Sequence, residues 1–207
     1  VVEVESEQVR LGGAANVAHN IRSLGGEPLL IGLAGTDHPG EVLLDLVRDQ
    51  GFATHGIIQD SSRPTTIKTR VIAQSQHVVR IDNESKQTCP PGLVAKMLEV
   101  VRAELPSLSG IIIEDYNKGV ITRELIHEVV ALARAQNVII TVDPKFDNFL
   151  EFKHVTVFKP NRREAEEVLG GRLKTDADVE RAGRKLIEIL QAENILLTRG
   201  ENGMSLV

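Results

Sequence analysis

The sequence lacks most of the features that mark secreted, membrane-spanning and disulfide-linked proteins. Its single cysteine, Cys89, excludes an intrachain disulfide and is typical of a reducing compartment. No apolar run approaches the roughly 20 residues that a membrane-spanning helix needs, and no signal-peptide pattern opens the chain. We therefore expect a cytoplasmic protein that does not enter a membrane.

The charge balance and the missing motifs exclude several ligand classes. The formal net charge is −5, whereas nucleic-acid-binding domains usually carry a basic surplus, so we expect no nucleic-acid partner. The P-loop pattern G-x-x-x-x-G-K-[ST] is absent, and no G-x-G-x-x-G follows the first predicted strands. The six histidines are scattered without metal-ligand spacing. The chain has no initiating methionine and ends within an apolar run at Val207, so we expect a segment cut at both ends.

What the sequence does contain is an alternation of apolar strand-like runs and helical segments. With 207 residues, of which 42% are hydrophobic, the chain can bury the core of one domain. Residues 1–9 alternate valine with glutamate, which predicts a strand, and residues 28–34 form a continuous apolar run typical of a buried strand. Such alternation favours an α/β sheet. Further strands are predicted at residues 110–113, 138–142, 155–158, 195–197 and 204–207.

Residues 56–82 break the alternation, because no helix interrupts them. They predict two strands, residues 65–73 and 77–82, around a polar turn, which we expect to join residues 1–9 in a small separate sheet. Strand alternation places Lys68 and Arg70 on one face and brings Arg80 near them from the partner strand. Such a cluster suits a phosphate on the substrate, and the alternative is an ordinary solvated hairpin face.

The stretch Leu11-Gly12-Gly13-Ala14-Ala15-Asn16 precedes a helical run that extends to about residue 24. Glycines let a ligand approach the backbone, and a helix start offers free N–H groups. The Asn16 amide donates and accepts at once, which suits a neutral, hydroxyl-rich ligand. The alternative is a tight turn without a ligand.

Polar side chains follow four of the predicted strands. In open α/β sheets ligands bind at the carboxyl ends of the strands, so these residues are candidates for a shared site. A single cluster of this kind is more often part of an ordinary polar loop than of a ligand site. The four clusters are Asp115 with Lys118, Asp143 with Lys145, Asn161 with Glu164, and Thr198 with Gly200.

Two of these clusters have the spacing of known ligand sites. Asn161-x-x-Glu164 places an amide and a carboxylate at one helix start, where the carboxylate can hold Mg²⁺ through water; the alternative is a helix cap. Thr198-x-Gly200-x-x-Gly203 can line a nucleotide phosphate with backbone N–H groups; the alternative is a turn between two strands.

Together these motifs resemble those of the ribokinase-like (PfkB-type) carbohydrate kinases, in the same order. Within that superfamily the chain is most similar to the D-glycero-β-D-manno-heptose-7-phosphate kinases, often the first domain of a bifunctional kinase/adenylyltransferase. The stretches that narrow the resemblance are Arg63-Pro64-Thr65-Thr66-Ile67-Lys68-Thr69-Arg70-Val71-Ile72, Val79-Arg80-Ile81-Asp82, Asp115-Tyr116-Asn117-Lys118-Gly119 and Gly203-Met204-Ser205-Leu206.

The resemblance implies a three-layer α/β/α fold with a mainly parallel central sheet and a small β-sheet lid. The chain would be one partial kinase domain, with the lid at about residues 1–10 and 56–82 and the α/β core at about residues 11–55 and 83–207. The lid would also form a homodimer contact. The implied cofactors are ATP and Mg²⁺. The implied sugar-binding residues are Gly12, Gly13, Asn16, Asp115, Lys118 and Lys145, and the implied ATP and Mg²⁺ residues are Asn161, Glu164, Thr198, Gly200 and Gly203.

The implied reaction transfers the ATP γ-phosphate to the anomeric hydroxyl of heptose 7-phosphate, in ADP-heptose and lipopolysaccharide core precursor synthesis. The family's catalytic Asp lies in a Gly-Ala-Gly-Asp motif, which does not occur in residues 1–207, so we expect it beyond Val207. The alternatives are a related kinase for ribose, fructose or a nucleoside, and a sugar- or nucleotide-binding domain without catalysis.

Overall fold

A computed structural model describes residues 3–74 and 76–207. The chain forms two compact units, Val1–Gln87 and Thr88–Val207, and each is described by itself. Among the described residues, no helix combines the length and the apolar character that crossing a membrane requires.

The first unit combines a short parallel strand pair with two helices and a hairpin. The apolar cluster of this unit contains Val47, Phe52 and Ile57, and Leu43 and Leu44 pack against it. Asp37 caps the second helix by accepting a hydrogen bond from the Gly40 N–H. The elements are α1 (Gly13–Ser23), β1 (Gly32–Ala34), α2 (His38–Asp49), β2 (Ile57–Gln59), β3 (Ile67–Ala73) and β4 (Gln76–Asn83).

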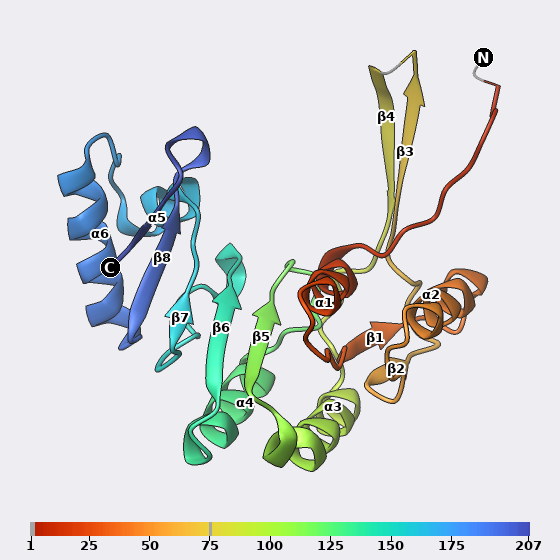
Figure 1. Ribbon diagram of the computed structural model, residues 1–207, viewed down its shortest axis with the longest axis horizontal. Helices are drawn as coiled ribbons and strands as arrows, with labels where there is room; N and C mark the ends of the chain where they lie inside the picture. Colours follow the sequence, from red (N-terminus) through yellow and green to blue (C-terminus); the bar gives the residue numbers. More distant parts are fainter. Residues whose placement is uncertain (1–2, 75) are drawn as a thin grey trace. The chain divides into compact units, whose positions relative to one another are not determined.

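The hairpin β3–β4 confirms the prediction of two antiparallel strands without an intervening helix (Figure 1). In its register Lys68 pairs with Asp82 and Arg70 pairs with Arg80, with a bulge after Val71. All residues of β4 are exposed. The predicted turn includes Ser75, which lies outside the described residues.

The prediction of a strand at residues 1–9 is wrong for the described part, since residues 3–10 belong to no helix or strand. Residues 3–10 are exposed, so the valines of this segment do not pack against an apolar surface. Within the described part of the chain, the segment also has no partner strand to pair with. Within residues 56–82, β2 pairs with β1 instead of the hairpin. The predicted buried strand at residues 28–34 shortens to β1, because its partner β2 offers only three residues.

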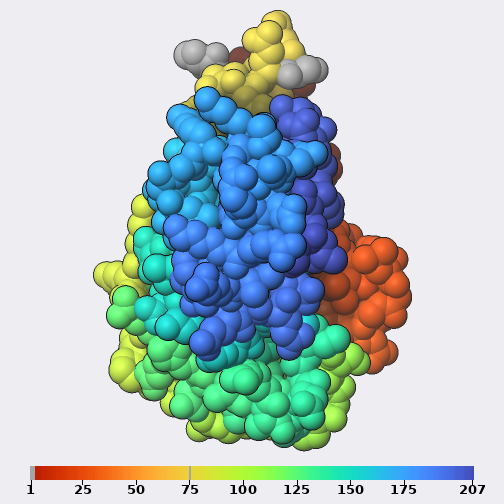
Figure 2. Space-filling model, turned by 90° about the vertical axis from the view of Figure 1, so that its left-hand side faces the viewer, coloured from red at the N-terminus to blue at the C-terminus, as the bar shows by residue number. Residues whose placement is uncertain are grey.

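The second unit contains a five-stranded sheet in the order β5-β6-β7-β8-β9. The first four strands are parallel and β9 is antiparallel to β8. Helix α4 packs on β6, and α6 packs on β8 and β9. Helix α6 accounts for much of the blue surface in Figure 2. The elements are α3 (Pro91–Glu104), β5 (Gly110–Glu114), α4 (Arg123–Ala135), β6 (Ile139–Asp143), β7 (Val157–Phe158), α5 (Arg162–Leu169), α6 (Asp176–Leu190), β8 (Asn194–Thr198) and β9 (Met204–Leu206).

The core of this unit is aromatic at its centre. The rings of Phe149 and Phe158 meet edge to face with centroids 4.8 Å apart, and both side chains are buried. Thr122 and Asn161 cap α4 and α5 as predicted, whereas α6 is capped by Thr175 rather than by Asp176 or Asp178. Helices with a mixed, mostly parallel sheet confirm the predicted α/β class.

Candidate functional site

The carboxyl ends of β5, β6, β7 and β8 form one edge of the sheet of the second unit, and their arrows point the same way in Figure 1. Glu114 at the end of β5 pairs with Asp143 at the end of β6. Beyond β7, Asn161 forms a parallel β-bridge with Thr198 at the end of β8. Residues from all four predicted strand-end clusters therefore belong to one sheet edge.

Asn161 and Glu164 form a complete capping box at the start of α5. The Asn161 side chain accepts from the Glu164 N–H at 2.9 Å, and Glu164 Oε2 accepts from the Asn161 N–H at 2.9 Å. The other oxygen, Oε1, pairs with Lys145 Nζ at 2.5 Å. Glu164 is buried, so Lys145 and the cap together compensate a carboxylate that burial alone would destabilise.

This geometry limits how Glu164 can hold Mg²⁺. Both of its oxygens already have protein partners, and the described residues contain no group of three or more His, Cys, Asp and Glu side chains placed for a metal ion. These residues fit a Mg²⁺ ion that is coordinated by the bound nucleotide and by water. The protein would contact such an ion only through its water ligands. It does not fit a metal held by the protein alone. The cap interpretation is confirmed, and the Mg²⁺ role stays a prediction.

Asp115 lies buried directly after β5. Its Oδ1 accepts from the Asn117 N–H at 2.8 Å and its Oδ2 from Asn148 Nδ2 at 2.9 Å. Burial raises the pKa of the Asp115 carboxyl, against the lowering effect of these two hydrogen bonds. Within the described residues, the buried Oδ1 of Asn117 accepts no hydrogen bond and is an unsatisfied acceptor in the loop of Asp115. Lys118 follows in the same loop.

Glu114 adds a second perturbed carboxyl at this edge. Burial raises its pKa, and the nearby Asp143 raises it further, whereas the Lys159 ammonium lowers it. Lys159 Nζ itself pairs with Asp143 Oδ2 at 2.8 Å. Glu114 ends β5 and Lys159 directly follows β7, so a systematic reading of strand ends would have included them among the candidate site residues. Asn148 ends a short 3-10 helix (Phe146–Asn148), away from the strand ends, and gave no such signal.

The Thr198 to Gly203 segment joins the antiparallel strands β8 and β9. Gly200 and Gly203 have φ values of +63° and +75°, a conformation that favours glycine. The Arg199 N–H bonds to the Gly203 carbonyl at 2.8 Å, which closes the turn. The interpretation as a turn between two strands is confirmed, and the phosphate-binding role stays a prediction.

In the first unit, Gly12 and Gly13 open α1 as predicted. Gly12 is the N-cap and makes no side-chain capping bond, and Gly13 has a φ of +54°. Gly12, Gly13 and Asn16 are exposed, and a Cβ built on Gly12 would meet no atom within 4 Å. The helix start therefore presents an open backbone surface.

The hairpin brings Lys68, Arg70 and Arg80 to one face, as the alternation predicted. Two carboxylates partly neutralise them: Lys68 Nζ lies 2.9 Å from both Asp82 Oδ2 and Glu84 Oε2, and Arg80 Nε lies 2.9 Å from Asp82 Oδ1. Hydrogen bonds from Lys68 and Arg80 hold the pKa of Asp82 below its usual value. Among the described residues, the guanidinium of Arg70 has no carboxylate partner and donates only to the Lys68 carbonyl at 3.5 Å.

The predicted site residues thus fall into three groups. Gly12, Gly13 and Asn16 stand at the start of α1, and the three hairpin cations stand on β3 and β4, all in the first unit. The remaining predicted residues belong to the sheet edge of the second unit. Three contacts link residues of this edge: a hydrogen bond between Asn148 and Asp115, an ion pair between Lys145 and Glu164, and a β-bridge between Asn161 and Thr198.

The raised pKa of Glu114 predicts a pH-dependent stability. Below the ordinary value of 4.5 the carboxyl is protonated in both states; as pH rises above 4.5, the unfolded chain releases its proton first, which disfavours folding. Glu114→Gln should therefore be more stable than the wild type at pH 7, and the difference should vanish near pH 4. Urea unfolding at both pH values measures it, with exposed Glu124→Gln as the control. A gain that is equal at both pH values would contradict the assignment.

Removing Lys145 should leave the buried Glu164 charge without its ammonium partner. Because the Lys145 side chain is 34% exposed, we expect Lys145→Met to cost about 1–2 kcal/mol, less than the ~3–5 kcal/mol of a fully buried pair. Urea unfolding measures the loss, with exposed Lys96→Met as the control. Lys145→Met combined with Glu164→Gln should recover part of the stability, and no recovery would refute the charge explanation.

Known proteins resemble this chain over nearly its whole length. The chain is 38% identical over 206 residues to the "Bifunctional protein HldE" of Geobacter sulfurreducens, covering 100% of the chain and 42% of that relative. It is 37% identical over 205 residues to the protein of the same name from Helicobacter pylori strain P12, covering 99% of the chain and 44% of the relative. The chain therefore spans less than half the length of these relatives.

Solved structures share the fold at low identity. The tetrameric inhibited form of phosphofructokinase-2 from Escherichia coli aligns with a TM-score of 0.74 at 20% identity, covering 100% of the chain and 70% of that structure. Ribokinase from Giardia lamblia aligns with a TM-score of 0.74 at 18% identity, covering 100% and 71%. The fold is ribokinase-like. The model of the pfkB family of carbohydrate kinases matches residues 1–207, so the chain belongs to the pfkB carbohydrate kinase family.

Proposed function

We propose that the protein carrying these residues is an ATP-dependent kinase for D-glycero-D-manno-heptose 7-phosphate. It transfers the γ-phosphate to the anomeric hydroxyl and forms the 1,7-bisphosphate, a step towards ADP-heptose and the lipopolysaccharide core. Identity of 37–38% with the HldE proteins over nearly the whole chain supports this choice within the family.

The observation that carries the substrate assignment is the cluster of Lys68, Arg70 and Arg80. A substrate that already bears a phosphate needs cationic donors away from the reacting hydroxyl, and arginine offers planar paired donors for phosphate oxygens. Asp82 and Glu84 hold Lys68 and Arg80 in place, which leaves Arg70 as the cation with the most freedom to bind an anion. A ribose or nucleoside kinase has no use for this cluster.

The other groups of residues take complementary roles in this proposal. Gly12, Gly13, Asn16, Asp115 and Lys118 bind sugar hydroxyls, and the Asn117 acceptor lies in the same loop as Asp115. Thr198, Gly200 and Gly203 line the ATP phosphates. Asn161 and Glu164 contact the Mg²⁺ of ATP through water, while Lys145 keeps Glu164 charge-compensated. The ion neutralises charge on the phosphates when ATP is bound.

The reaction balances around one proton. The oxygen of the anomeric hydroxyl forms a bond to the γ-phosphorus as the bond to the β-phosphate oxygen breaks, so ADP leaves and the hydroxyl proton needs an acceptor. The family's acceptor is the Asp of Gly-Ala-Gly-Asp, and residues 1–207 contain no such motif. We therefore assign binding and positioning to these residues and the proton transfer to a residue outside them.

Three further assignments belong to this proposal. The exposed apolar face of the hairpin, which includes Val79 and Ile81, supports a homodimer contact through the lid, and light scattering on the full-length protein tests it. The length of the relatives and their designation as bifunctional support a second, adenylyltransferase domain, which sequencing beyond the codon for Val207 tests. The single cysteine is consistent with a cytoplasmic location, which cell fractionation tests.

The direct test is ADP release by the full-length protein with ATP and Mg²⁺. Heptose 7-phosphate, ribose and fructose 6-phosphate are offered separately, and we expect turnover only with heptose 7-phosphate. Turnover with ribose or fructose 6-phosphate instead would assign the protein to another branch of the family. Nucleotide binding without turnover of any acceptor would indicate a binding domain without catalysis.

Reversing the charge of Arg70 should distinguish the contribution of the substrate phosphate to binding from that of the sugar. Charge-assisted hydrogen bonds contribute about 1.5–3 kcal/mol, so Arg70→Glu should weaken heptose 7-phosphate binding by about 10- to 100-fold. Binding of the unphosphorylated heptose should change little. Calorimetric titration of both ligands measures the effect, and Arg48→Glu on α2 provides the same charge change away from the hairpin. Equal weakening for both ligands would remove Arg70 from the phosphate site.

A further inference from the structure

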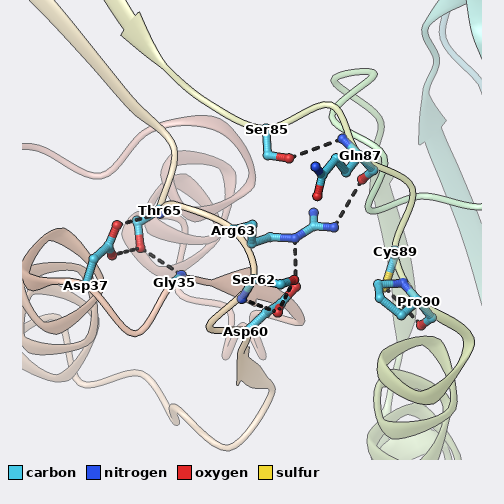
Figure 3. Close-up of polar contacts among 10 residues, drawn as sticks. All are labelled: Gly35, Asp37, Asp60, Ser62, Arg63, Thr65, Ser85, Gln87, Cys89 and Pro90. Carbon is cyan, nitrogen blue, oxygen red and sulfur yellow. Dashed lines mark hydrogen bonds and ion pairs between the residues drawn. The ribbon is translucent and has the colours of Figure 1, made fainter.

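The base of the hairpin is fixed by two side chains of the segment that leads into β3, Arg63 and Thr65 (Figure 3). Both are buried, although β3 itself begins only at Ile67. Neither residue belongs to the three groups of predicted site residues.

Thr65 joins the hairpin to the start of α2. Its N–H donates to Asp37 Oδ2 at 3.0 Å, and its hydroxyl donates to Asp37 Oδ1 at 2.6 Å. The same hydroxyl oxygen accepts from the Gly35 N–H at 2.8 Å. Asp37 also caps α2 through Gly40, so one carboxylate serves both the helix and the hairpin base. The hydrogen bond from Thr65 is the largest cause that lowers the pKa of Asp37.

Arg63 joins the chain that enters the hairpin to the chain that leaves it. Its Nε donates to Asp60 Oδ2 at 2.9 Å, and its Nη2 donates to the Gln87 carbonyl at 3.1 Å. Asp60 is held in turn by the N–H and hydroxyl of Ser62, and its own N–H donates to the Ala34 carbonyl at the end of β1. Arg63 thus connects both ends of the hairpin to the parallel strand pair.

The backbone at this base is closely packed, with no room for a side chain at Gly35 or Gly40. A Cβ on Gly35 would lie 2.8 Å from the Arg63 carbonyl oxygen and 2.8 Å from the Thr65 nitrogen. A Cβ on Gly40 would lie 2.3 Å from the Gly35 carbonyl oxygen. Close packing and buried hydrogen bonds of this kind define one arrangement of the connected elements.

Above the base, the hairpin has little else to fix its direction. All residues of β4 are exposed, and most of β3 is exposed as well. Because a two-stranded hairpin is marginally stable alone, its position depends on how its ends are attached. Lys68 lies three residues after Thr65, on the strand that this attachment directs.

We propose that Arg63 and Thr65 are positioning residues that set the place of the phosphate-binding cations Lys68, Arg70 and Arg80. They contact no substrate and act through the hairpin. This assignment rests on the proposed phosphate role of the three cations. It explains why the segment from Arg63 to Arg70 carries two kinds of polar residue, the first for attachment and the second for binding.

The kinetic test compares Thr65→Val with Thr65→Ser in the full-length protein. Valine matches threonine in shape but loses both hydrogen bonds of the hydroxyl, whereas serine keeps them. We expect Thr65→Val to raise KM for heptose 7-phosphate about tenfold, with kcat and KM for ATP changed less than about twofold. Thr65→Ser should behave as the wild type. An equal loss in kcat, or an equal rise in KM for ATP, would overturn the positioning role.

A second measurement does not depend on the substrate. Nitroxide labels on Asp49→Cys at the end of α2 and Gln76→Cys at the start of β4, in a Cys89→Ser background, report the distance from the hairpin to its unit. We expect one narrow distance distribution in the wild type and in Thr65→Ser, and a broadened one in Thr65→Val. Equal widths in all three proteins would overturn the anchor.

The two measurements separate the anchor from the proposed function. If the wild type turns over no heptose 7-phosphate, the proposed function fails, and the distance widths alone decide whether Thr65 anchors the hairpin. Broadening without a change in KM for heptose 7-phosphate would overturn the link to the substrate.

If circular dichroism shows that Thr65→Val does not fold, Asp37→Asn replaces it, because it weakens the same contacts without removing the hydroxyl. The same broadening, to a smaller extent, is then expected, and an unchanged width would overturn the anchor.

Discussion

Parallel pairing of β5, β6, β7 and β8 is the constraint on which the candidate site of the second unit depends. Parallel strands end at one edge, and whatever residues follow them are brought together whether or not they carry chemistry. Here these residues are carboxylates, amides and lysines, so the edge concentrates charge in a partly buried place. The raised pKa values of Glu114 and Asp115 are a direct consequence, because the sheet and its loops remove water from both carboxyls.

The contacts of Glu164 show that its structural role as a helix cap need not compete with its proposed role near Mg²⁺. One oxygen completes the cap of α5 and the other binds Lys145, so the residue is fixed by the helix start and by the loop after β6. A carboxylate held this firmly does not need to rearrange when a charged ligand approaches, which is the property that preorganised sites require. Each of its oxygens already accepts a hydrogen bond from the protein, which favours contact with an ion through water over direct coordination.

The sequence predicted the parts of the fold that depend on local pattern. Helix caps at Thr122 and Asn161, the hairpin, and the strand ends of the second unit all follow from residue types at fixed spacing. Residues 3–9 were predicted wrongly as a strand. Their alternation is a local pattern, whereas a strand also needs a partner strand, which only the tertiary structure supplies. The candidate site follows the same rule. Asp115 became a candidate from its place after a strand, and Asn161 with Glu164 from their spacing, which are local patterns. The ion pair of Lys145 with Glu164 and the contact of Asn148 with Asp115 join residues 19 and 33 positions apart, so no local pattern predicts them.

The segment from Arg63 to Arg70 shows how one short stretch can serve two purposes. Before Ile67 the chain is not yet in the hairpin, so Arg63 and Thr65 are buried against residues of α2 and of the β1 and β2 ends. From Ile67 the strand projects away from that base, and alternation turns Lys68 and Arg70 to a single exposed face. The change from buried to exposed therefore occurs within a few residues, at the point where hydrogen bonds to side chains give way to hydrogen bonds between strands. An exposed cationic face is useful for recognition only if its place is defined, and an exposed hairpin cannot define its own place. The buried polar contacts at its base supply what the strands lack, which is why we treat the stretch as one functional element rather than as two motifs.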